Sequence, residues 1–191
     1  MEVSRHSKLE NNYKYGFTTD IESEQIPKGI NEDTVRLISS IKKEPEWVTD
    51  FRLKGYKSWK QQKHPKWHNL DIPEIDFQDI VYYSAPKGTE EVKTLEDLPP
   101  EILDTYKKIG IPLDEVKQLE GIAVDAVFDS VSVGTQVNEA LDKAGVIFCP
   151  ISEAVERYPD LVKKYMGSVV PASDNYYAAL NTAAFSDGSF V

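Results

Sequence analysis

The residue best suited to chemistry in this sequence of 191 residues is its one cysteine, Cys149, in the stretch GVIFCPIS. A thiolate can act as a nucleophile or carry sulfur when a helix N-terminus or a nearby cation lowers its pKa. The sequence predicts a helix over 153–158, capped by Ser152, three residues after the cysteine. The apolar residues before Cys149, however, predict a buried strand over 146–149, and cysteine is among the most buried residue types. Cys149 is therefore interpreted as structural, with a thiol-dependent sulfur carrier or thiol enzyme as the alternative.

Two histidines, His64 and His68, are four residues apart, which is the spacing of zinc ligands on one helical face. Pro65 lies between them and prevents a continuous helix from presenting both imidazoles together. Cys149 and His6 do not complete a recognisable ligand set. The sequence therefore predicts no metal site.

A basic and aromatic segment extends from Trp47 to Trp67 and could stack bases and contact phosphates. Its basic residues are Arg52, Lys54, Lys57, Lys60, Lys63 and Lys66. A helix over 45–61 would have one apolar face, formed by Trp47, Val48, Phe51, Gly55 and Trp59. The opposite face would carry Lys54, Lys57 and Lys60. Because the two kinds of side chain point to opposite sides, the segment is interpreted as a solvated face over a buried one.

Other chemical motifs are absent from the sequence, which has no glycine-rich phosphate loop, no Gly-x-Ser-x-Gly elbow and no His-Glu-x-x-His pair. Asp125 and Asp129 are four residues apart, but they lie in a strand-like run, which gives little support to acid–base catalysis by this pair. No catalytic, cofactor-binding or metal-binding residue is therefore assigned. The chain is not expected to be an enzyme.

The net charge of −10 is unevenly distributed along the chain. Residues 1–70 contain 13 Lys and Arg against 10 Asp and Glu, whereas residues 71–191 contain 9 against 22. The acidic remainder would repel a phosphate backbone, so general nucleic-acid binding is not expected. With one cysteine, no apolar leader and no apolar run long enough to cross a membrane, the sequence predicts a soluble, cytoplasmic protein.

Periodicity and cap residues predict a helix-rich α+β fold with several short strands. Residues 1–30 are expected to form an extended arm, and residues 31–180 the main domain. The arm would be anchored by Tyr13, Tyr15, Phe17 and Ile21. Helices are predicted over 32–43, 45–61, 99–109, 113–119, 136–144, 153–158, 159–166 and 174–182, with Asn31 and Ser173 among the N-caps. Strands are predicted over 80–83, 122–133 and 146–149.

The last eleven residues, NTAAFSDGSFV, predict a β-hairpin, because a Ser-Asp-Gly-Ser turn stands between apolar residues. Only three residues follow Gly188, whereas a strand usually has five or six. Residues 181–191 are therefore interpreted as the start of a structure that this chain does not complete. An unpaired apolar strand at 183–191 would favour aggregation, so we expect the isolated chain to oligomerise or dissolve poorly.

Seven stretches, which follow one another in order and cover nearly everything after residue 12, give the chain a family resemblance. They are YKYGFTTDIESE (13–24), PKGINEDTVRLIS (27–39), EPEW with FRLKGY (44–56), DIVYYSAPK (79–87), GIAVDAVFDSVSV (121–133), GVIFCPISEA (145–154) and GSVVPASDNYYAALNTAAFSDGSFV (167–191). In these stretches the chain resembles the N-terminal region of SufB, the scaffold subunit of the SUF iron–sulfur cluster assembly system.

The resemblance implies that FSDGSFV, residues 185–191, leads into a right-handed parallel β-helix in the family. It also implies that the cluster ligands, the sulfur-accepting cysteine and most contacts with SufC and SufD lie beyond Val191. The chain is then a SufB-like N-terminal domain that has no cofactor of its own and is inactive alone. A stand-alone module whose arm, residues 13–30, docks on SUF partners is the alternative.

Overall fold

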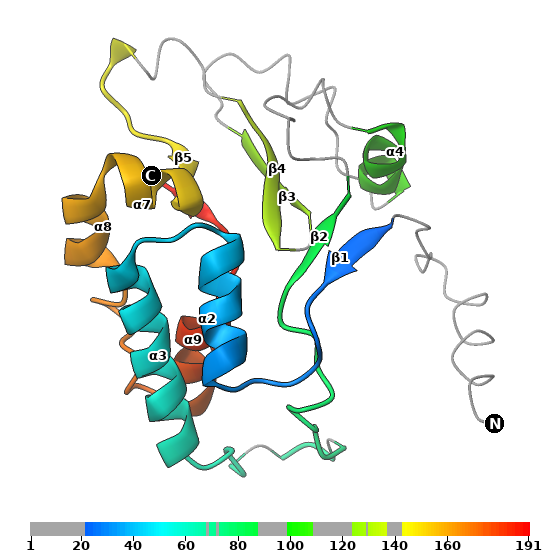
Figure 1. The fold of residues 1–191 in the computed structure, drawn as a ribbon, viewed down its shortest axis with the longest axis vertical. Helices are drawn as coiled ribbons and strands as arrows, with labels where there is room; N and C mark the ends of the chain where they lie inside the picture. Colours follow the sequence, from blue (N-terminus) through cyan, green and yellow to red (C-terminus); the bar gives the residue numbers. More distant parts are fainter. Residues whose placement is uncertain are drawn as a thin grey trace.

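The computed structural model describes residues 22–67, 69–71, 73–87, 99–108, 124–128, 130–136 and 143–191. Within these ranges the chain forms six helices and three two-stranded antiparallel sheets (Figure 1). The predicted helix-rich fold with short strands is therefore confirmed. The described strands do not form a parallel β-helix.

Three helices form the centre of the fold: α2 (Glu32–Ile41), α3 (Glu46–Gln61) and α9 (Tyr176–Ala184). Figure 1 shows α9, from the end of the chain, behind α2 and α3. The backbones of α3 and α9 approach closely at Gly55, where an added Cβ would lie 2.7 Å from Thr182. The core that these helices share consists of Ile30, Val35, Leu53, Tyr56, Trp59, Ala179 and Ala183.

The buried face of α3 is wider than the predicted one. Leu53 and Tyr56 were expected outside the apolar stripe, but both are buried. Trp47 and Phe51, which were predicted within the stripe, are only half-buried. The reason is that α3 is covered by both α2 and α9, so more than one stripe of the helix leaves water. The residues that agree with the prediction are Val48, Gly55 and Trp59, which are buried, and Lys54, Lys57 and Lys60, which are exposed.

Helix α2 begins as predicted, with the Asn31 side chain accepting a hydrogen bond of 2.8 Å from the backbone N–H of Thr34. It ends two residues earlier than predicted, because Lys43 adopts a positive φ of 52° in the turn that leads to α3. Ile41, in the last turn of α2, is 42% exposed, whereas Val35 and Ile38 on the same helical face are buried. Pro45 is the N-cap of α3 rather than its first residue.

Two sheets lie beside this helical centre. Strand β1 (Ser23–Gln25) pairs with β2 (Ser84–Pro86), and β3 (Val124–Phe128) forms a hairpin with β4 (Val131–Gln136). A backbone hydrogen bond of 2.8 Å from Ser130 N to Ser84 O joins the two sheets. The β-rich character of the segment after 122 is thus confirmed for its described part, whereas residue 136 belongs to a strand and does not begin a helix.

The strand predicted over 80–83 is wrong, because these residues are irregular and the strand begins at Ser84. The carbonyls of Ile80 and Tyr83 accept hydrogen bonds from the backbone N–H groups of Gly29 and Ile26. Pro27 lies between these two donors and has no N–H, so the ladder is interrupted there.

Helix α4 (Pro100–Lys108) lies on the far side of the sheets from α2 (Figure 1). Ile102 and Tyr106 are buried, as the predicted helical face requires, while Leu103 is half-buried. The Tyr106 hydroxyl donates a hydrogen bond of 2.9 Å to the carbonyl of Val127, which fixes α4 against the hairpin of β3 and β4.

Two short helices follow the sheets: α7 (Ile151–Arg157) and α8 (Pro159–Tyr165). Pro159 begins α8 as predicted, but Ser152 lies inside α7 and is not its cap. Helix α9 is capped by Asn175, whose side chain accepts hydrogen bonds from Tyr177 N and Ala178 N, and not by Ser173. Asparagine and serine are about equally good caps, so local preference did not decide between the two positions.

The predicted C-terminal hairpin is wrong. Ala183 and Ala184, expected in its first strand, belong to α9. Strand β6 (Ser189–Phe190) pairs instead with β5 (Cys149–Pro150), so that Cys149 lies opposite Phe190. The strand predicted over 146–149 is thereby reduced to its last residue.

Several expectations concern positions outside the described residues. These are the arm anchors Tyr13, Tyr15, Phe17 and Ile21, the helix over 113–119, most of the helix over 136–144, and the side chains of His6, His68, Asp125 and Asp129.

Candidate functional site

The most unusual buried residue is Arg52, whose side chain is fully removed from solvent in the middle of α3. Its guanidinium holds Glu44 through two hydrogen bonds, Nε to Oε2 at 2.7 Å and Nη2 to Oε1 at 2.6 Å. Nη1 donates to the carbonyl of Phe185 at 2.6 Å, and the guanidinium carbon lies 3.6 Å from the centre of the Phe185 ring. Arg52 therefore ties the end of α9 to α3 with its charge neutralised.

Sequence reasoning listed Arg52 with the basic residues of the 47–67 segment and assigned it to neither face of the helix. The angular position of Arg52 around the helix axis could have revealed its burial. At about 100° per residue, Arg52 lies roughly 160° from Lys54 around α3 and thus on the buried side. An arginine in that position requires a carboxylate partner, and Glu44 supplies it.

A second buried ion pair lies beside the first. Lys42 Nζ is 3.2 Å from Asp187 Oδ2, and the two side chains are only 5% and 3% exposed. The other carboxylate oxygen of Asp187 accepts hydrogen bonds from Gly188 N at 3.0 Å and Ser152 N at 3.4 Å. Asp187 is thus held by α2, the first turn of α7 and its own segment, which explains why its Asp-Gly sequence does not form a hairpin.

Polar side chains connect the Arg52–Glu44 pair to α2 and α3. Ser39 donates to Glu44 at 2.9 Å and lies 2.6 Å from the hydroxyl oxygen of Thr49. We use the name buried junction for Lys42, Glu44, Arg52 and Asp187. Because each charge in it has a partner, the desolvation of the four side chains is compensated.

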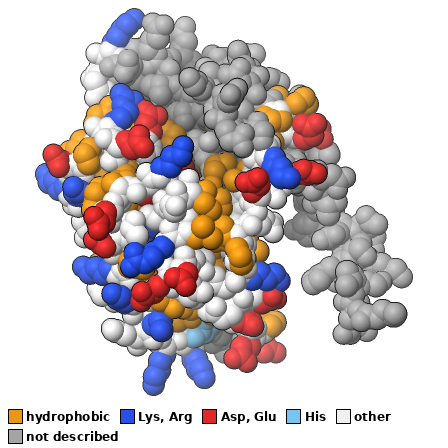
Figure 2. All heavy atoms as spheres, in the orientation of Figure 1, with side chains coloured by type: hydrophobic (Ala, Val, Ile, Leu, Met, Phe, Trp, Pro, Cys, Tyr) orange, Lys and Arg blue, Asp and Glu red, His pale blue; other side chains and the backbone are white. Residues whose placement is uncertain are grey.

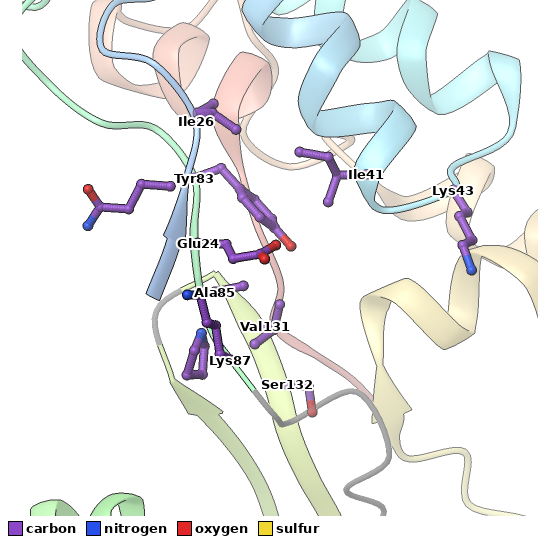
Figure 3. A pocket seen from close by; sticks show the side chains of 11 residues that line it. Glu24, Ile26, Ile41, Lys43, Tyr83, Ala85, Lys87, Val131 and Ser132 are labelled. Atoms are coloured by element: carbon purple, nitrogen blue, oxygen red, sulfur yellow. The ribbon is translucent and has the colours of Figure 1, made fainter. Parts of the chain in front are cut away.

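A groove of about 550 Å³ lies next to the buried junction, between the end of α2, the β1–β2 sheet and the start of β4. Figure 3 shows the Tyr83 ring pointing into it. Apolar side chains of Ile26, Ile41 and Val131 line it, and Lys43 and Lys87 lie at its edge. Lys87 also forms a salt bridge of 3.0 Å with Glu22. The remaining lining residues are Glu24, Gln25, Tyr83, Ala85, Pro86 and Ser132.

The electrostatics of the groove keep Tyr83 protonated. Burial raises the pKa of Tyr83, and the carboxylates of Asp187 and Glu24 raise it further. Its hydroxyl is therefore a hydrogen-bond donor at neutral pH and not a phenolate nucleophile. The groove can bind a partly apolar segment, but the chemistry of its lining residues does not suggest bond making or breaking.

Cys149 lies away from the groove, in an apolar cluster with Val48, Val155 and Val162. Its exposure is 4%, so the interpretation as a buried residue is confirmed. The strand prediction around it is weaker, since Val146 is 39% exposed.

His64 does not meet a second metal-ligating side chain in the described structure. Its Nε2 is 2.8 Å from the hydroxyl of Tyr177, and its ring packs against Phe77 and Tyr176. Across the described ranges, no three His, Cys, Asp or Glu side chains are grouped so that they could hold a metal ion. With one buried cysteine, the residues present do not fit an iron–sulfur cluster, which would in any case be cargo of an assembly protein.

No helix in the described part of the chain has the length and apolar character needed to span a bilayer.

Comparison with known proteins supplies the functional context. The family model described as "SufBD protein N-terminal region" matches residues 97–191. The iron–sulfur cluster assembly SufBD family protein ycf24 of Pyropia yezoensis is 59% identical over 178 residues, which is 93% of this chain and 37% of that protein. The SufBD family protein slr0074 of Synechocystis is 56% identical over 94% of this chain and 38% of its own length.

A plant relative, the SufBD family protein ABCI8 of Arabidopsis thaliana, described as chloroplastic, is 53% identical over 95% of this chain and 33% of its own length. The chain thus spans 33–38% of the length of these relatives. On these matches the chain belongs to the SufBD family of iron–sulfur cluster assembly proteins and corresponds to their N-terminal region.

Proposed function

We propose that this chain acts as the N-terminal region of a SufB-type scaffold for iron–sulfur cluster assembly. The observation that carries the proposal is the identity of 59% over 93% of the chain with a SufBD family protein whose name states that function. The role is structural, because the site described above contains binding surfaces and buried ion pairs but no reactive group.

The buried junction has a specific part in this role. Arg52 holds the carbonyl of Phe185, and Lys42 holds the carboxylate of Asp187, so the segment 185–190 leaves the domain in a fixed direction. In a longer SufB-type protein this segment would connect the N-terminal region to whatever follows it. Two neutralised charge pairs in a buried site give that connection a defined geometry.

The iron–sulfur cluster is the cargo in this proposal. Its ligands, and most contacts with SufC and SufD, would be supplied outside residues 1–191. The described residues support that division, since Cys149 is buried among apolar side chains and has the environment of a structural cysteine.

The experiment is a chimera in a Synechocystis strain depleted of slr0074. This chain would replace the matching 38% of slr0074, and growth and the activity of iron–sulfur enzymes would be measured. We expect the chimera to restore both and the 191-residue chain alone to restore neither. A chimera that folds and accumulates, yet fails to restore growth, would contradict the proposal.

Two alternative functions make different predictions for the chain alone. A sulfur carrier that uses Cys149 would require the chain alone to accept sulfur, which the burial of Cys149 disfavours. A stand-alone interaction module is favoured by the exposed groove beside β1. It would bind SufC or SufD without the rest of a scaffold, and a pull-down with the chain alone tests this directly.

A further inference from the structure

The second half of α3 and the loop after it carry lysines at every third position. We use the name basic edge for Lys54, Lys57, Lys60, Lys63 and Lys66. All five are exposed, and no Asp or Glu occurs between Phe51 and Leu70. Figure 2 shows Lys and Arg side chains at the bottom and lower left of the molecule, where Figure 1 places the end of α3, and Asp and Glu side chains at the lower right. The chain as a whole is acidic, so this concentration of positive charge is local.

The lysines of the basic edge form no ion pair within the described ranges. Lys60 lies 5.6 Å from the centre of the Tyr56 ring, and no salt bridge joins any of the five to a carboxylate within the described ranges. Acidic residues follow in the loop 71–79, but Asp79 pairs with Lys28 instead. Lysines near a helix C-terminus interact favourably with the negative end of the helix dipole. This accounts for Lys60 but not for Lys63 and Lys66, which lie beyond the helix.

An exposed tryptophan ends the basic edge. Trp67 is 87% exposed, and Leu70, three residues later, is 69% exposed. Single apolar residues on a surface are ordinary, but a tryptophan leaves a large apolar area in water. Tryptophan is also among the residue types that dominate the binding energy of protein interfaces. Lys66 immediately precedes Trp67, so positive charge and an apolar side chain are both exposed at this end of the basic edge.

The loop that carries Trp67 is held in place from its first residues. Gln62 donates from its side chain to the carbonyl of Ala172 at 3.2 Å. His64 is fixed by the Tyr177 hydroxyl and by its ring contacts with Phe77 and Tyr176. Because these contacts order the loop before any partner arrives, binding at the basic edge would cost less conformational entropy.

We propose that the basic edge and Trp67 together form a docking surface for an acidic segment of a partner protein that carries an apolar anchor residue. Charge complementarity supports this occupant. A long phosphate polymer or an anionic membrane would also meet the carboxylates of residues 71–79 and the net charge of −10, both repulsive. A short acidic segment needs to contact only the exposed lysines of α3 and the loop after it, whereas a polymer or a membrane extends over more of the acidic chain. The lysines of α3 are about 4.5 Å apart along the helix axis, which suits one carboxylate for each.

The test uses the 191-residue chain and a fluorescein-labelled peptide of four glutamates, one leucine and four glutamates. The matched control peptide has glutamine in place of every glutamate. Fluorescence anisotropy should show that the glutamate peptide binds at least about tenfold more tightly than the glutamine peptide. The difference should shrink as salt rises, because charges are screened over about 10 Å at 0.1 M and over about 30 Å at 0.01 M.

Variants locate the binding. Lys60→Glu combined with Lys63→Glu should weaken the binding of the glutamate peptide about tenfold or more. Lys163→Glu combined with Lys164→Glu makes the same charge change on exposed lysines of α8 and should leave affinity within about threefold. Trp67→Ala should weaken binding about tenfold, while Trp67→Phe should retain part of it. Circular dichroism should show the native helix content in every variant.

Four results would overturn the proposal. Equal losses in the two double lysine variants would indicate a general effect of net charge. Binding of a ten-residue oligothymidine, or of phosphatidylglycerol vesicles, with no binding of the peptide would assign the surface to another class of partner. Self-association that is abolished by Lys60→Glu with Lys63→Glu would show that the surface binds a second copy of the chain. Unchanged affinity of the Trp67→Ala variant for the glutamate peptide would show that Trp67 does not contact the apolar anchor residue.

Discussion

Lys42 and Asp187 are 145 residues apart in the sequence and form a salt bridge of 3.2 Å in which both side chains are almost fully buried. Lys42 follows the first helix of the core, and Asp187 precedes the last strand. The pair therefore fixes the segment before β6 to the end of α2. A buried charge whose partner is removed cannot regain its hydration without local opening, so this contact should be sensitive to substitution.

Asp187→Asn should lower the free energy of unfolding by about 3–5 kcal/mol, because it leaves Lys42 buried without a counter-charge. Urea denaturation followed by circular dichroism measures the change. The matched control is Asp79→Asn, which removes the exposed salt bridge with Lys28 and should cost no more than about 1 kcal/mol. Similar effects of the two substitutions would show that burial of the Lys42–Asp187 pair does not matter.

Arg52→Met should destabilise the chain by about 3–5 kcal/mol, since it leaves the buried Glu44 without its counter-charge and the carbonyl of Phe185 without the guanidinium donor. Arg52→Lys should recover only part of this loss, because an ammonium group cannot make the two parallel bonds to Glu44. The exposed Arg36 provides the control, and Arg36→Met should change the unfolding free energy by less than about 0.5 kcal/mol. Full recovery in Arg52→Lys would contradict the bidentate role.

Gly55→Ala should destabilise the packing of α3 on α9 by about 1–3 kcal/mol, because the new methyl group would overlap Thr182. In an ordinary helix the same substitution would stabilise by up to about 1 kcal/mol, so the sign of the effect is diagnostic. Gly188→Ala places a methyl group in open space and serves as the control. A more stable Gly55→Ala variant would mean that the two helices can move apart at no cost.

Tyr82 should titrate at unusually high pH. Burial raises the pKa of Tyr82 to about 12, with smaller contributions from Tyr176 and Asp76. An unfolded tyrosine loses its proton near pH 10. The contribution of protonated Tyr82 to the stability of the folded state is therefore complete below pH 10 and is lost as the pH rises from 10 towards 12. Ultraviolet titration of tyrosinate absorbance, compared between the native chain and Tyr82→Phe, measures the value. A native titration that ends near pH 10 would contradict it.

Cys149 should react slowly with alkylating reagents. Its side chain lies in an apolar cluster and is 4% exposed, so a reagent reaches it only when the structure opens locally. We expect alkylation by iodoacetamide at pH 7.5 to be at least about tenfold slower than in the urea-unfolded chain. Rapid native labelling would favour the alternative of a functional thiol.

The sequence predicted local features well. The Asn31 cap, the proline at the start of α8 and the exposed lysines of α3 each depend on neighbours within about one helical turn. Their free-energy contributions act in any tertiary context, so periodicity and cap rules found them. The position of Cys149 in a buried site was also predicted, because the residues before it are apolar.

Local rules failed where distant segments compete for the same atoms. The Ser-Asp-Gly-Ser sequence favours a hairpin, yet the carboxylate of Asp187 is bound by Lys42 and Ser152 N, and its neighbours Ser189 and Phe190 pair with β5. Residues 80–83 do not form the predicted strand for a similar reason. Pro27 has no N–H and interrupts the hydrogen bonds with the segment opposite them. Neither partner is close in sequence.

The sequence by itself determined the family of this chain, its helix-rich character, its main cap residues and the basic character of the second half of α3. The tertiary structure alone decided that the buried Arg52 forms an ion pair with Glu44, that Asp187 forms one with Lys42, and that Trp67 stands exposed at the end of the basic edge. The physical reason is that burial of charge depends on a partner brought together by the fold. A helix cap or an apolar stripe needs only its own segment.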